Sequence, residues 1–240
     1  MAAPRRAFLD ANVLRGQLTT DVLLSVAASK LYSPRWSAEV LEEVRRNRPP
    51  GLPPERTESR FAQMAKAFPK AMVTDYEHLM PEMQADEKDK HVLAAAVSSR
   101  SDVLVTENVK DFDPPTTGSN AMPIERTSEF LGRLLSEEPQ LVVASLEKMV
   151  ARNRLAPRTM PELIDKMATQ QELQAFAVEL NNILPPQKRG THPNLQALQA
   201  ATTALDGLPS PTEAVANKPV EAPEVRKNVE GPEKSQDKEL

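Results

Sequence analysis

The chain has 240 residues, of which 40% are hydrophobic, so it is long enough to bury a core, and the absence of cysteine excludes disulfides and thiolate metal sites. The net charge of -4 gives no global sign of nucleic-acid binding, although Lys and Arg outnumber Asp and Glu in the first 50 residues. No stretch approaches the roughly 20 apolar residues of a membrane span, and charged residues interrupt any signal-like run at the N-terminus, so we expect a cytoplasmic protein.

Short apolar runs alternate with helical patterns over the first half of the chain. The predicted strands are residues 7–9, 31–33, 71–73 and 102–106. The predicted helices are residues 13–28, 37–46, 55–68 and 88–100, with a helical turn at 76–80. Strands separated by helices indicate an α/β fold with a parallel sheet flanked by helices.

The sequence pattern changes near residue 127, because no further strand is predicted after it. Helices are expected over residues 128–135, 139–152, 160–168 and 172–184. After residue 205 the sequence is rich in proline and charge and has no aromatic residue, which is typical of disorder. We therefore expect an α/β domain at 1–126, a helical C-terminal extension at 127–185, and a linker with a disordered tail at 186–240.

Acidic residues recur where the predicted elements begin or end. They are Asp10 after the first strand, Glu39, Glu42 and Glu43 on the helix over 37–46, Asp86 and Asp89 at the start of the helix over 88–100, and Asp111 after the last strand. Ligands of parallel sheets bind at the carboxyl ends of the strands, so Asp10 and Asp111 are expected at one edge. Taken alone, Asp10 has a simpler interpretation, as a cap of the next helix, and Asp86 has the same alternative.

A cluster of carboxylates repels itself unless a cation holds it together. Oxygen ligands suit Mg²⁺ or Mn²⁺. The three histidines, His78, His91 and His192, show no zinc-ligand spacing. A carboxylate-bound ion can activate water for attack on phosphate, so the residues favour a metal-dependent phosphodiesterase.

The order of four segments, "FLDANVL", "SAEVLEEVRRN", "DEKDKHVLAAAV" and "VLVTENVKDF", resembles the PIN-domain ribonucleases. In particular it resembles the VapC-like toxins of type II toxin–antitoxin systems that carry a helical C-terminal extension, over residues 5–185. The resemblance implies a PIN-like sheet and a Mg²⁺-dependent endoribonuclease. It also implies that Asp10, Glu43 and Asp89 hold the metal, with Glu42 as the alternative register for Glu43.

The sequence departs from the family pattern after the last strand. Many members carry an Asp two residues after the threonine, whereas this chain reads Thr106-Glu107-Asn108. Asp111 could supply the missing charge as a catalytic acid, or a fourth acid could be dispensable. We expect Asn108 and Thr106 to face the substrate, with orientation of a carboxylate as a second role for the Thr106 hydroxyl.

Several polar residues near the acids have two interpretations each. Arg15 and Arg46 could contact RNA phosphates, or they could belong to solvated helix ends. Asn12 is expected to cap the first long helix, and a contact to Asp10 is the alternative. His91 is expected to be structural. Because aromatic residues are scarce, base stacking has little support, and a structured RNA such as tRNA or rRNA is the expected substrate.

The resemblance also implies partners. These are a VapB-like antitoxin, whose arginine would pair with the carboxylates, and a second copy of the chain in a homodimer. The competing hypothesis is a non-catalytic PIN-fold module that binds RNA or protein, because Asn108 weakens the metal site. Loss of activity with EDTA or with Asp10→Asn would distinguish the two.

Overall fold

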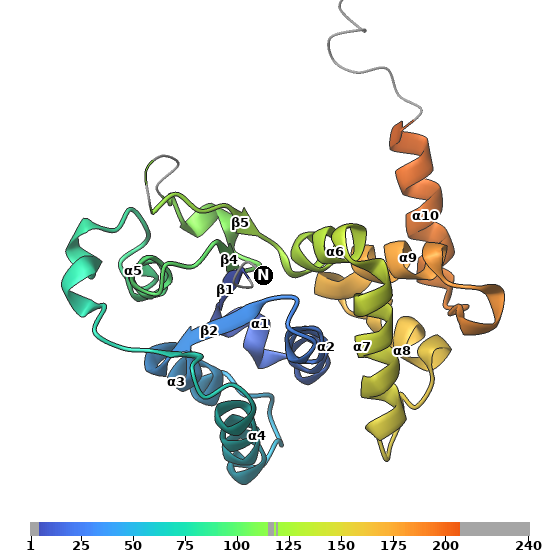
Figure 1. Ribbon diagram of the computed structural model, residues 1–240, viewed down its shortest axis with the longest axis horizontal. Helices are drawn as coiled ribbons and strands as arrows, with labels where there is room; N and C mark the ends of the chain where they lie inside the picture. Colours follow the sequence, from blue (N-terminus) through green and yellow to red (C-terminus); the bar gives the residue numbers. More distant parts are fainter. Residues whose placement is uncertain (1–4, 115–117, 119, 207–240) are drawn as a thin grey trace, which may run out of the picture. The chain divides into compact units, whose positions relative to one another are not determined.

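The computed structural model describes residues 5–114, 118 and 120–206 (Figure 1). The chain divides into two compact units, residues 1–201 and residues 202–240. The first unit carries the sheet and the helices that bear on function. The disorder expected for the tail falls, from residue 207 onward, outside the described residues. Within the described part, no helix is long and apolar enough to cross a membrane.

A five-stranded sheet with all neighbours parallel forms the centre of the α/β part, as predicted. Its strand order is β3 (Met72–Val73), β2 (Ser33–Ser37), β1 (Arg6–Leu9), β4 (Val103–Val105) and β5 (Ile124–Glu125). The chain moves outward from β1 to β3 on one side and then returns to place β4 on the other side of β1. The carboxyl ends of β1 and β4 therefore flank the point where the strand order reverses, which is where open α/β sheets bind ligands.

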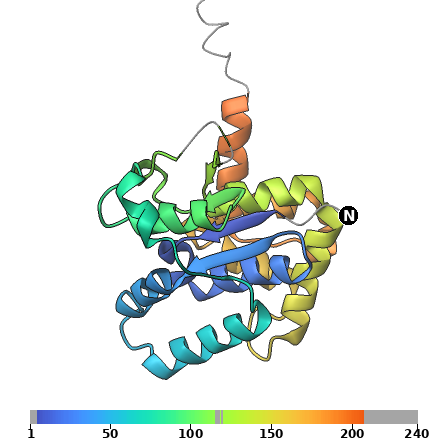
Figure 2. The same cartoon turned by 60° about the vertical axis from the view of Figure 1, so that its left-hand side comes forward.

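Helices cover both faces of this sheet (Figure 2). The α/β part holds α1 (Ala11–Arg15), α2 (Gln17–Ala28), α3 (Ala38–Arg46), α4 (Pro54–Ala67) and α5 (Lys90–Ser98), with short 3-10 helices η1 (Glu77–Glu82) and η2 (Val109–Asp111). Helix α5 contacts β1, β2 and β4. The side chains of Ala7, Phe8 and Leu9 are fully buried, which explains why β1 is a continuous apolar run rather than an alternating one.

The first predicted helix, over residues 13–28, is two helices in the structure. Gly16 adopts an extended conformation (φ -72°, ψ 125°) and separates α1 from α2. The Thr20 hydroxyl donates hydrogen bonds to the carbonyls of Leu14 and Gly16, at 3.0 and 2.8 Å. The side chain of Thr20 thereby links the end of α1 and Gly16 to the first turn of α2. A regular apolar periodicity over residues 13–28 is thus compatible with two helices.

The strand predicted at residues 31–33 was wrong, because β2 runs over Ser33–Ser37. Pro34 cannot donate a backbone hydrogen bond, which disfavours it inside a strand. Here it lies near the start of β2, opposite Ala7, and the backbone of β2 donates instead through Ser33 N to Arg5 O (2.7 Å) and Trp36 N to Ala71 O (3.0 Å). The Ser37 hydroxyl then accepts from Val40 N and begins α3.

The helices predicted after residue 127 are present. They are α6 (Thr127–Glu137), α7 (Pro139–Arg152), α8 (Met160–Met167) and α9 (Gln174–Ile183), with η3 (Gln171–Leu173) before α9 and η4 (Pro186–Lys188) after it. Pro139 and Pro161 lie in first turns, where the missing N–H has no cost. A further helix, α10 (Pro193–Asp206), forms in the segment where no helix was predicted.

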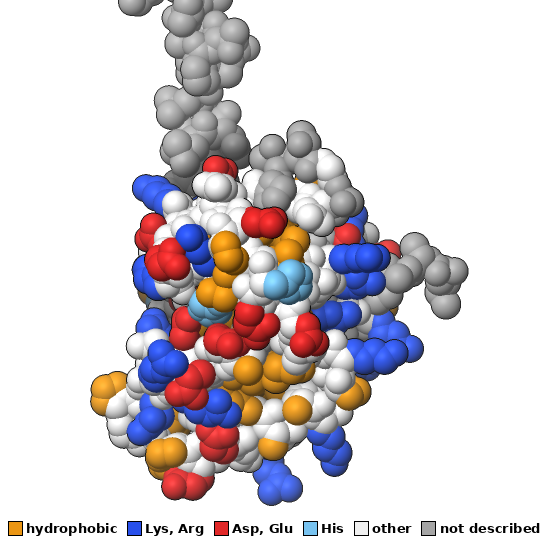
Figure 3. All heavy atoms as spheres, turned by 90° about the vertical axis from the view of Figure 1, so that its left-hand side faces the viewer, with side chains coloured by type: hydrophobic (Ala, Val, Ile, Leu, Met, Phe, Trp, Pro, Cys, Tyr) orange, Lys and Arg blue, Asp and Glu red, His pale blue; other side chains and the backbone are white. Residues whose placement is uncertain are grey.

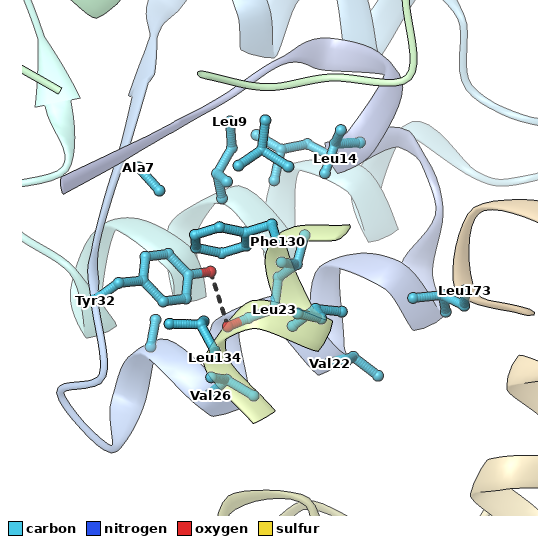
Figure 4. Close-up of a cluster of buried hydrophobic side chains, with 14 of the residues drawn as sticks. Ala7, Leu9, Leu14, Val22, Leu23, Val26, Tyr32, Phe130, Leu134 and Leu173 are labelled. Atoms are coloured by element: carbon cyan, nitrogen blue, oxygen red, sulfur yellow. Dashed lines mark hydrogen bonds between the residues drawn. The ribbon is translucent and has the colours of Figure 1, made fainter. Parts of the chain in front are cut away.

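The helical extension shares a hydrophobic core with the α/β part. Phe130 of α6 packs edge-on against Tyr32, with ring centroids 4.9 Å apart and an interplanar angle of 86°. The Tyr32 hydroxyl donates to the carbonyl of Leu23 at 2.9 Å, which satisfies its buried polar group (Figure 4). Side chains of Ala7, Leu9 and Leu134 lie around this pair. The extension is therefore part of the stabilising core of the first unit.

Candidate active site

A hollow of about 790 Å³ opens at the carboxyl ends of the strands. Its acidic lining residues are Asp10, Glu39, Glu43 and Asp89. Figure 3 views the molecule from the side toward which the β2 arrow of Figure 1 points, and it shows acidic side chains gathered across the middle of that face with basic side chains around them. The hollow is called the acidic pocket below.

Asp10 lies at the junction of β1 and α1 and is both a cap and a pocket residue. Its side chain is only 6% exposed. Oδ1 accepts from Ala11 N at 2.6 Å, and Oδ2 accepts from Thr106 Oγ1 and Asn12 Nδ2, each at 2.7 Å. The two interpretations open for Asp10 in the sequence, cap or cleft residue, are thus not exclusive.

The electrostatic environment of Asp10 disfavours its charge. The pKa of Asp10 is raised from 3.8 to about 6, and burial is the largest cause. The hydrogen bonds from Thr106 and Ala11 act in the opposite direction, whereas the nearby carboxylates of Glu43 and Asp89 contribute to the rise. The three acids are therefore close enough to feel one another, and a cation among them would favour the ionised form of each.

Asn12 does not cap a helix as expected, because Asp10 takes that position. Instead Asn12 Nδ2 donates to Asp10 Oδ2 and to Thr106 Oγ1, at 2.7 and 2.9 Å, and its Oδ1 accepts from Glu107 N at 3.2 Å. The alternative interpretation of Asn12, a contact to Asp10, is the one found. This side chain links the end of β1 to the end of β4.

The neighbouring acids of α3 point to different surroundings. Glu43 lines the acidic pocket, and its Oε1 lies 2.7 Å from His91 Nε2 on α5. Glu42 forms ion pairs with Arg45 and Arg46, at 3.2 and 3.5 Å, outside the pocket lining. The geometry favours Glu43 over Glu42 as the α3 acid of the site. His91 was expected to be structural; it is buried but also lines the pocket, and its Nδ1 has no hydrogen-bond partner.

Asp89 occupies the N-cap position of α5 but does not cap the helix with its side chain. Its Oδ2 is buried without a hydrogen bond, and Lys88 Nζ forms an ion pair with it at 3.5 Å. Burial raises the pKa of Asp89, Lys88 lowers it, and Asp111 and Glu43 raise it. The long ion pair with Lys88 leaves room for a closer positive ligand at this carboxylate.

The residues after β4 are split between the pocket and its surroundings. Asn108 is exposed and lines the pocket, and its backbone N–H donates to Thr106 Oγ1 at 3.1 Å. Thr106 is fully buried, so its hydroxyl contacts Asp10 rather than solvent. Asp111 is not among the lining residues, although its charge acts on Asp89. Asp86 is also outside the lining, and its carbonyl accepts from Asp89 N at 2.8 Å.

Both arginines singled out in the sequence reach the pocket wall. Arg15 and Arg46 are exposed lining residues, and Arg46 also pairs with Glu42. Sequence reasoning missed Lys88 and Met80, which line the pocket as well. It also missed the hydrogen bond from the Tyr76 hydroxyl to Glu39. The "DEKDK" run did place a lysine next to Asp89, which is the signal that could have identified Lys88.

The chemistry of the donors fits a hard divalent cation. Asp10, Glu43 and Asp89 offer carboxylate oxygens to one hollow, and the buried Oδ2 of Asp89 lacks a hydrogen bond. Across the described residues, however, no three His, Asp or Glu side chains gather closely enough to form a preformed metal cage.

The strand order and the acids at the reversal point define an α/β protein of the PIN-like class. Comparison with known proteins agrees: the PIN domain family matches residues 6–110, and the VapC50 C-terminal domain family matches residues 128–182. A curated relative, "Putative ribonuclease VapC50" of Mycobacterium tuberculosis, is 30% identical over 115 residues, which is 48% of this chain and 67% of the relative. No solved structure matches the chain. The chain belongs to the VapC-like family of PIN-domain ribonucleases.

Proposed function

We propose that the protein is a Mg²⁺-dependent (or Mn²⁺-dependent) endoribonuclease that cleaves a structured RNA, tRNA or rRNA, as the toxin of a toxin–antitoxin module. Residues 1–126 form the nuclease domain in this proposal, 127–185 the helical extension, and 186–240 the linker and tail. One observation carries it. Carboxylates from three separate elements, Asp10, Glu43 and Asp89, line one pocket at the strand-order reversal.

Each pocket residue has a proposed role that follows from its contacts. Asp10, Glu43 and Asp89 would hold the cation, which when bound supplies positive charge at the attacked phosphate and acidifies a water molecule. Thr106 and Asn12 orient Asp10 through the hydrogen bonds to Oδ2. His91 orients Glu43 through its contact with Oε1.

The residues at the pocket wall are proposed to meet the RNA. Arg15 and Arg46 would bind phosphates as exposed cations, and Asn108 would hydrogen-bond the strand. Asp111 acts on Asp89 through its charge, so it is proposed to tune the site as a fourth acid. The sequence family implies a VapB-like antitoxin as the protein partner and admits a homodimer, and we propose both.

Metal dependence is the direct test of this function. Purified protein is incubated with bacterial RNA and Mg²⁺, and the same reaction is run with EDTA. Discrete fragments that require Mg²⁺ are expected, and mapping of their ends identifies the RNA and the cut site. Cleavage that survives EDTA would refute a metal-dependent nuclease.

A second candidate function is a binding module on the same fold. It is favoured by the lack of a preformed three-ligand cage among the described residues and by Asn108 in place of an acid. Such a module would bind RNA or protein without cleaving. Stoichiometric binding of RNA with no fragments at any Mg²⁺ or Mn²⁺ concentration would select it.

A further inference from the structure

Two smaller hollows continue from the acidic pocket toward the helical extension. Their volumes are about 380 and 500 Å³. Arg15 lines both the acidic pocket and the hollow of 380 Å³, and Gln17, Asp21 and Arg56 line both smaller hollows. Because neighbouring hollows share these walls, they lie one beside the next as far as the segment 153–157 between α7 and α8. We call the two smaller hollows together the side groove.

The side groove is rich in positive charge. Its cationic lining residues are Arg15, Arg56, Arg60, Arg154 and Lys166, and its acidic lining residue is Asp21. Within the described chain, none of the five cations has a carboxylate within ion-pair distance. Arg45 shows the contrasting case, since it pairs with both Glu42 and Glu58.

Arg60 and Asp21 show how the groove is balanced. Arg60 Nε is buried without a hydrogen-bond partner, and burial lowers the pKa of Arg60 while Asp21 raises it. Burial raises the pKa of Asp21, and the charges of Arg152, Arg60 and Lys166 lower it. The single carboxylate therefore offsets only part of the positive charge around it. The exposed cations of the groove are open to an anionic ligand, which would accept charge-assisted hydrogen bonds from them.

We propose that the side groove binds the phosphate backbone of the RNA strand that leads away from the acidic pocket. This inference rests on the proposed function, since the strand in the groove is the one the acids would cut. Its chemistry is phosphate contact by exposed arginine and lysine, which gives affinity without reading bases. The helical extension takes part in the binding, because Arg154 and Lys166 lie in it.

An RNA strand fits the side groove better than an acidic protein segment. The groove opens at Arg15 into a pocket lined by Asp10, Glu43 and Asp89. RNA and an acidic peptide are both polyanions, so the position of the groove beside the acids, and not its charge, distinguishes them. The side groove lies next to the acidic pocket. A long RNA strand can therefore place the bond to be cut at the acids while its neighbouring nucleotides bind in the side groove.

Binding and cleavage are tested separately. The full chain with Asp10→Asn, which cannot cleave under the proposed function, is titrated into a short fluorescein-labelled RNA hairpin. Charge reversals Arg56→Glu, Arg154→Glu and Lys166→Glu are compared with Lys148→Glu, an exposed cation of α7 that lines neither hollow. Circular dichroism melting confirms that each variant is folded.

Each groove reversal is expected to weaken hairpin binding about tenfold and to reduce the slope of log Kd against log salt by about one. Lys148→Glu should leave both unchanged. Groove variants that bind as tightly as Lys148→Glu would overturn the proposal. A poly-glutamate peptide that binds the groove more tightly than the hairpin would also overturn it, in favour of an acidic protein partner.

Cleavage distinguishes failure of the groove from failure of the nuclease. The variants Arg154→Glu and Lys166→Glu are then made in the chain with Asp10 intact. They should cut the hairpin more slowly than the native protein does. They should cut a dinucleotide at the native rate, because a dinucleotide is too short to reach the extension. If the groove reversals leave hairpin binding unchanged while the native protein cleaves RNA, the groove alone is refuted. Groove-dependent binding with no cleavage of either substrate refutes the nuclease alone.

Discussion

The hydroxyl of Thr106 donates a hydrogen bond of 2.7 Å to Asp10 Oδ2 and so joins the end of β4 to the end of β1. The donor is fully buried and the acceptor nearly so. Asn12 Nδ2 donates to the same oxygen and to the same hydroxyl. The carboxylate is thus fixed in orientation and partly compensated for its burial before any metal or substrate arrives.

Thr106→Val should move the pH dependence of RNA cleavage upward. Valine keeps the shape of threonine but removes the donor that lowers the pKa of Asp10, so that pKa should rise above about 6. The acidic limb of the pH–rate profile should shift by about one unit, and Thr106→Ser should restore it. An acidic limb that stays in place in Thr106→Val would show that the hydroxyl does not act through Asp10.

The raised pKa of Asp10 also makes stability depend on pH. Between pH 3.8 and about 6 the folded protein binds a proton that the unfolded chain releases. The stability linked to this proton is complete below pH 3.8 and is lost as pH rises through about 6, on the order of 2–3 kcal/mol in total. Asp10→Asn cannot titrate, so its melting temperature relative to the native chain should be higher at pH 8 than at pH 5. Metal-free calorimetry measures this, and a difference independent of pH would contradict it.

Glu43 and Glu42 form a matched pair for testing the site. Glu43→Gln should reduce Mg²⁺-dependent cleavage at least a hundredfold, because the side chain lines the acidic pocket and an amide is a weaker ligand for a hard cation. Glu42→Gln should change the rate by no more than a few fold, since it removes only ion pairs to Arg45 and Arg46. Single-turnover rates on one RNA compare them. Equal losses of cleavage rate in both variants would contradict the assignment of Glu43, and not Glu42, to the acidic pocket.

Asp89 should govern metal affinity. A cation that binds only the folded state raises its melting temperature. Mn²⁺ should therefore stabilise the native chain, and Asp89→Asn should lose most of that response because its carboxylate lines the acidic pocket and its buried Oδ2 has Lys88 as its ion-pair partner and no closer hydrogen bond. Differential scanning fluorimetry over a Mn²⁺ series measures the shift. Identical shifts for the two proteins would remove Asp89 from the metal site.

Phe130 should be the residue through which the extension stabilises the α/β part. Phe130→Ala removes a ring that is 1% exposed and packs edge-on against Tyr32, so the free energy of unfolding should fall by about 3–5 kcal/mol. Leu155→Ala provides the control, because that side chain is 83% exposed and should contribute little. Urea unfolding compares the two. A loss in Phe130→Ala no larger than in the control would mean that the extension is energetically separate.

Local patterns predicted the elements whose signals are local. Three elements can be identified without tertiary information. Their signals are the buried run Ala7–Leu9, the helix start at Asp89 and the proline of α7. The position of β2 could not be predicted, because Pro34 reads as a strand breaker until its pairing with Ala7 is known. Two-residue β5 is too short to show any periodicity.

The acids proposed for the site, Asp10, Glu43 and Asp89, line one pocket in the structure, whereas the contacts of Asn12 and Thr106 with a carboxylate were only second interpretations in the sequence. Asp10 and Asp89 follow from strand ends and helix starts, which the sequence reveals. Choosing Glu43 as the pocket residue requires knowing which side of α3 faces α5 and His91. That depends on tertiary structure, which local sequence patterns do not show. The roles of Asn12 and Thr106 depend on β1 and β4 being adjacent, although 94 positions separate these residues in the chain.

The measurement that tests the central claim most directly is cleavage of total bacterial RNA by the native protein, Asp10→Asn and Asp89→Asn, with Mg²⁺ and with matched melting curves. The proposed site predicts discrete fragments from the native protein and a loss of at least a hundredfold in both variants, each still folded. Equal cleavage by all three proteins, or none by the native protein, would contradict the assignment of these acids to an RNA-cleaving centre.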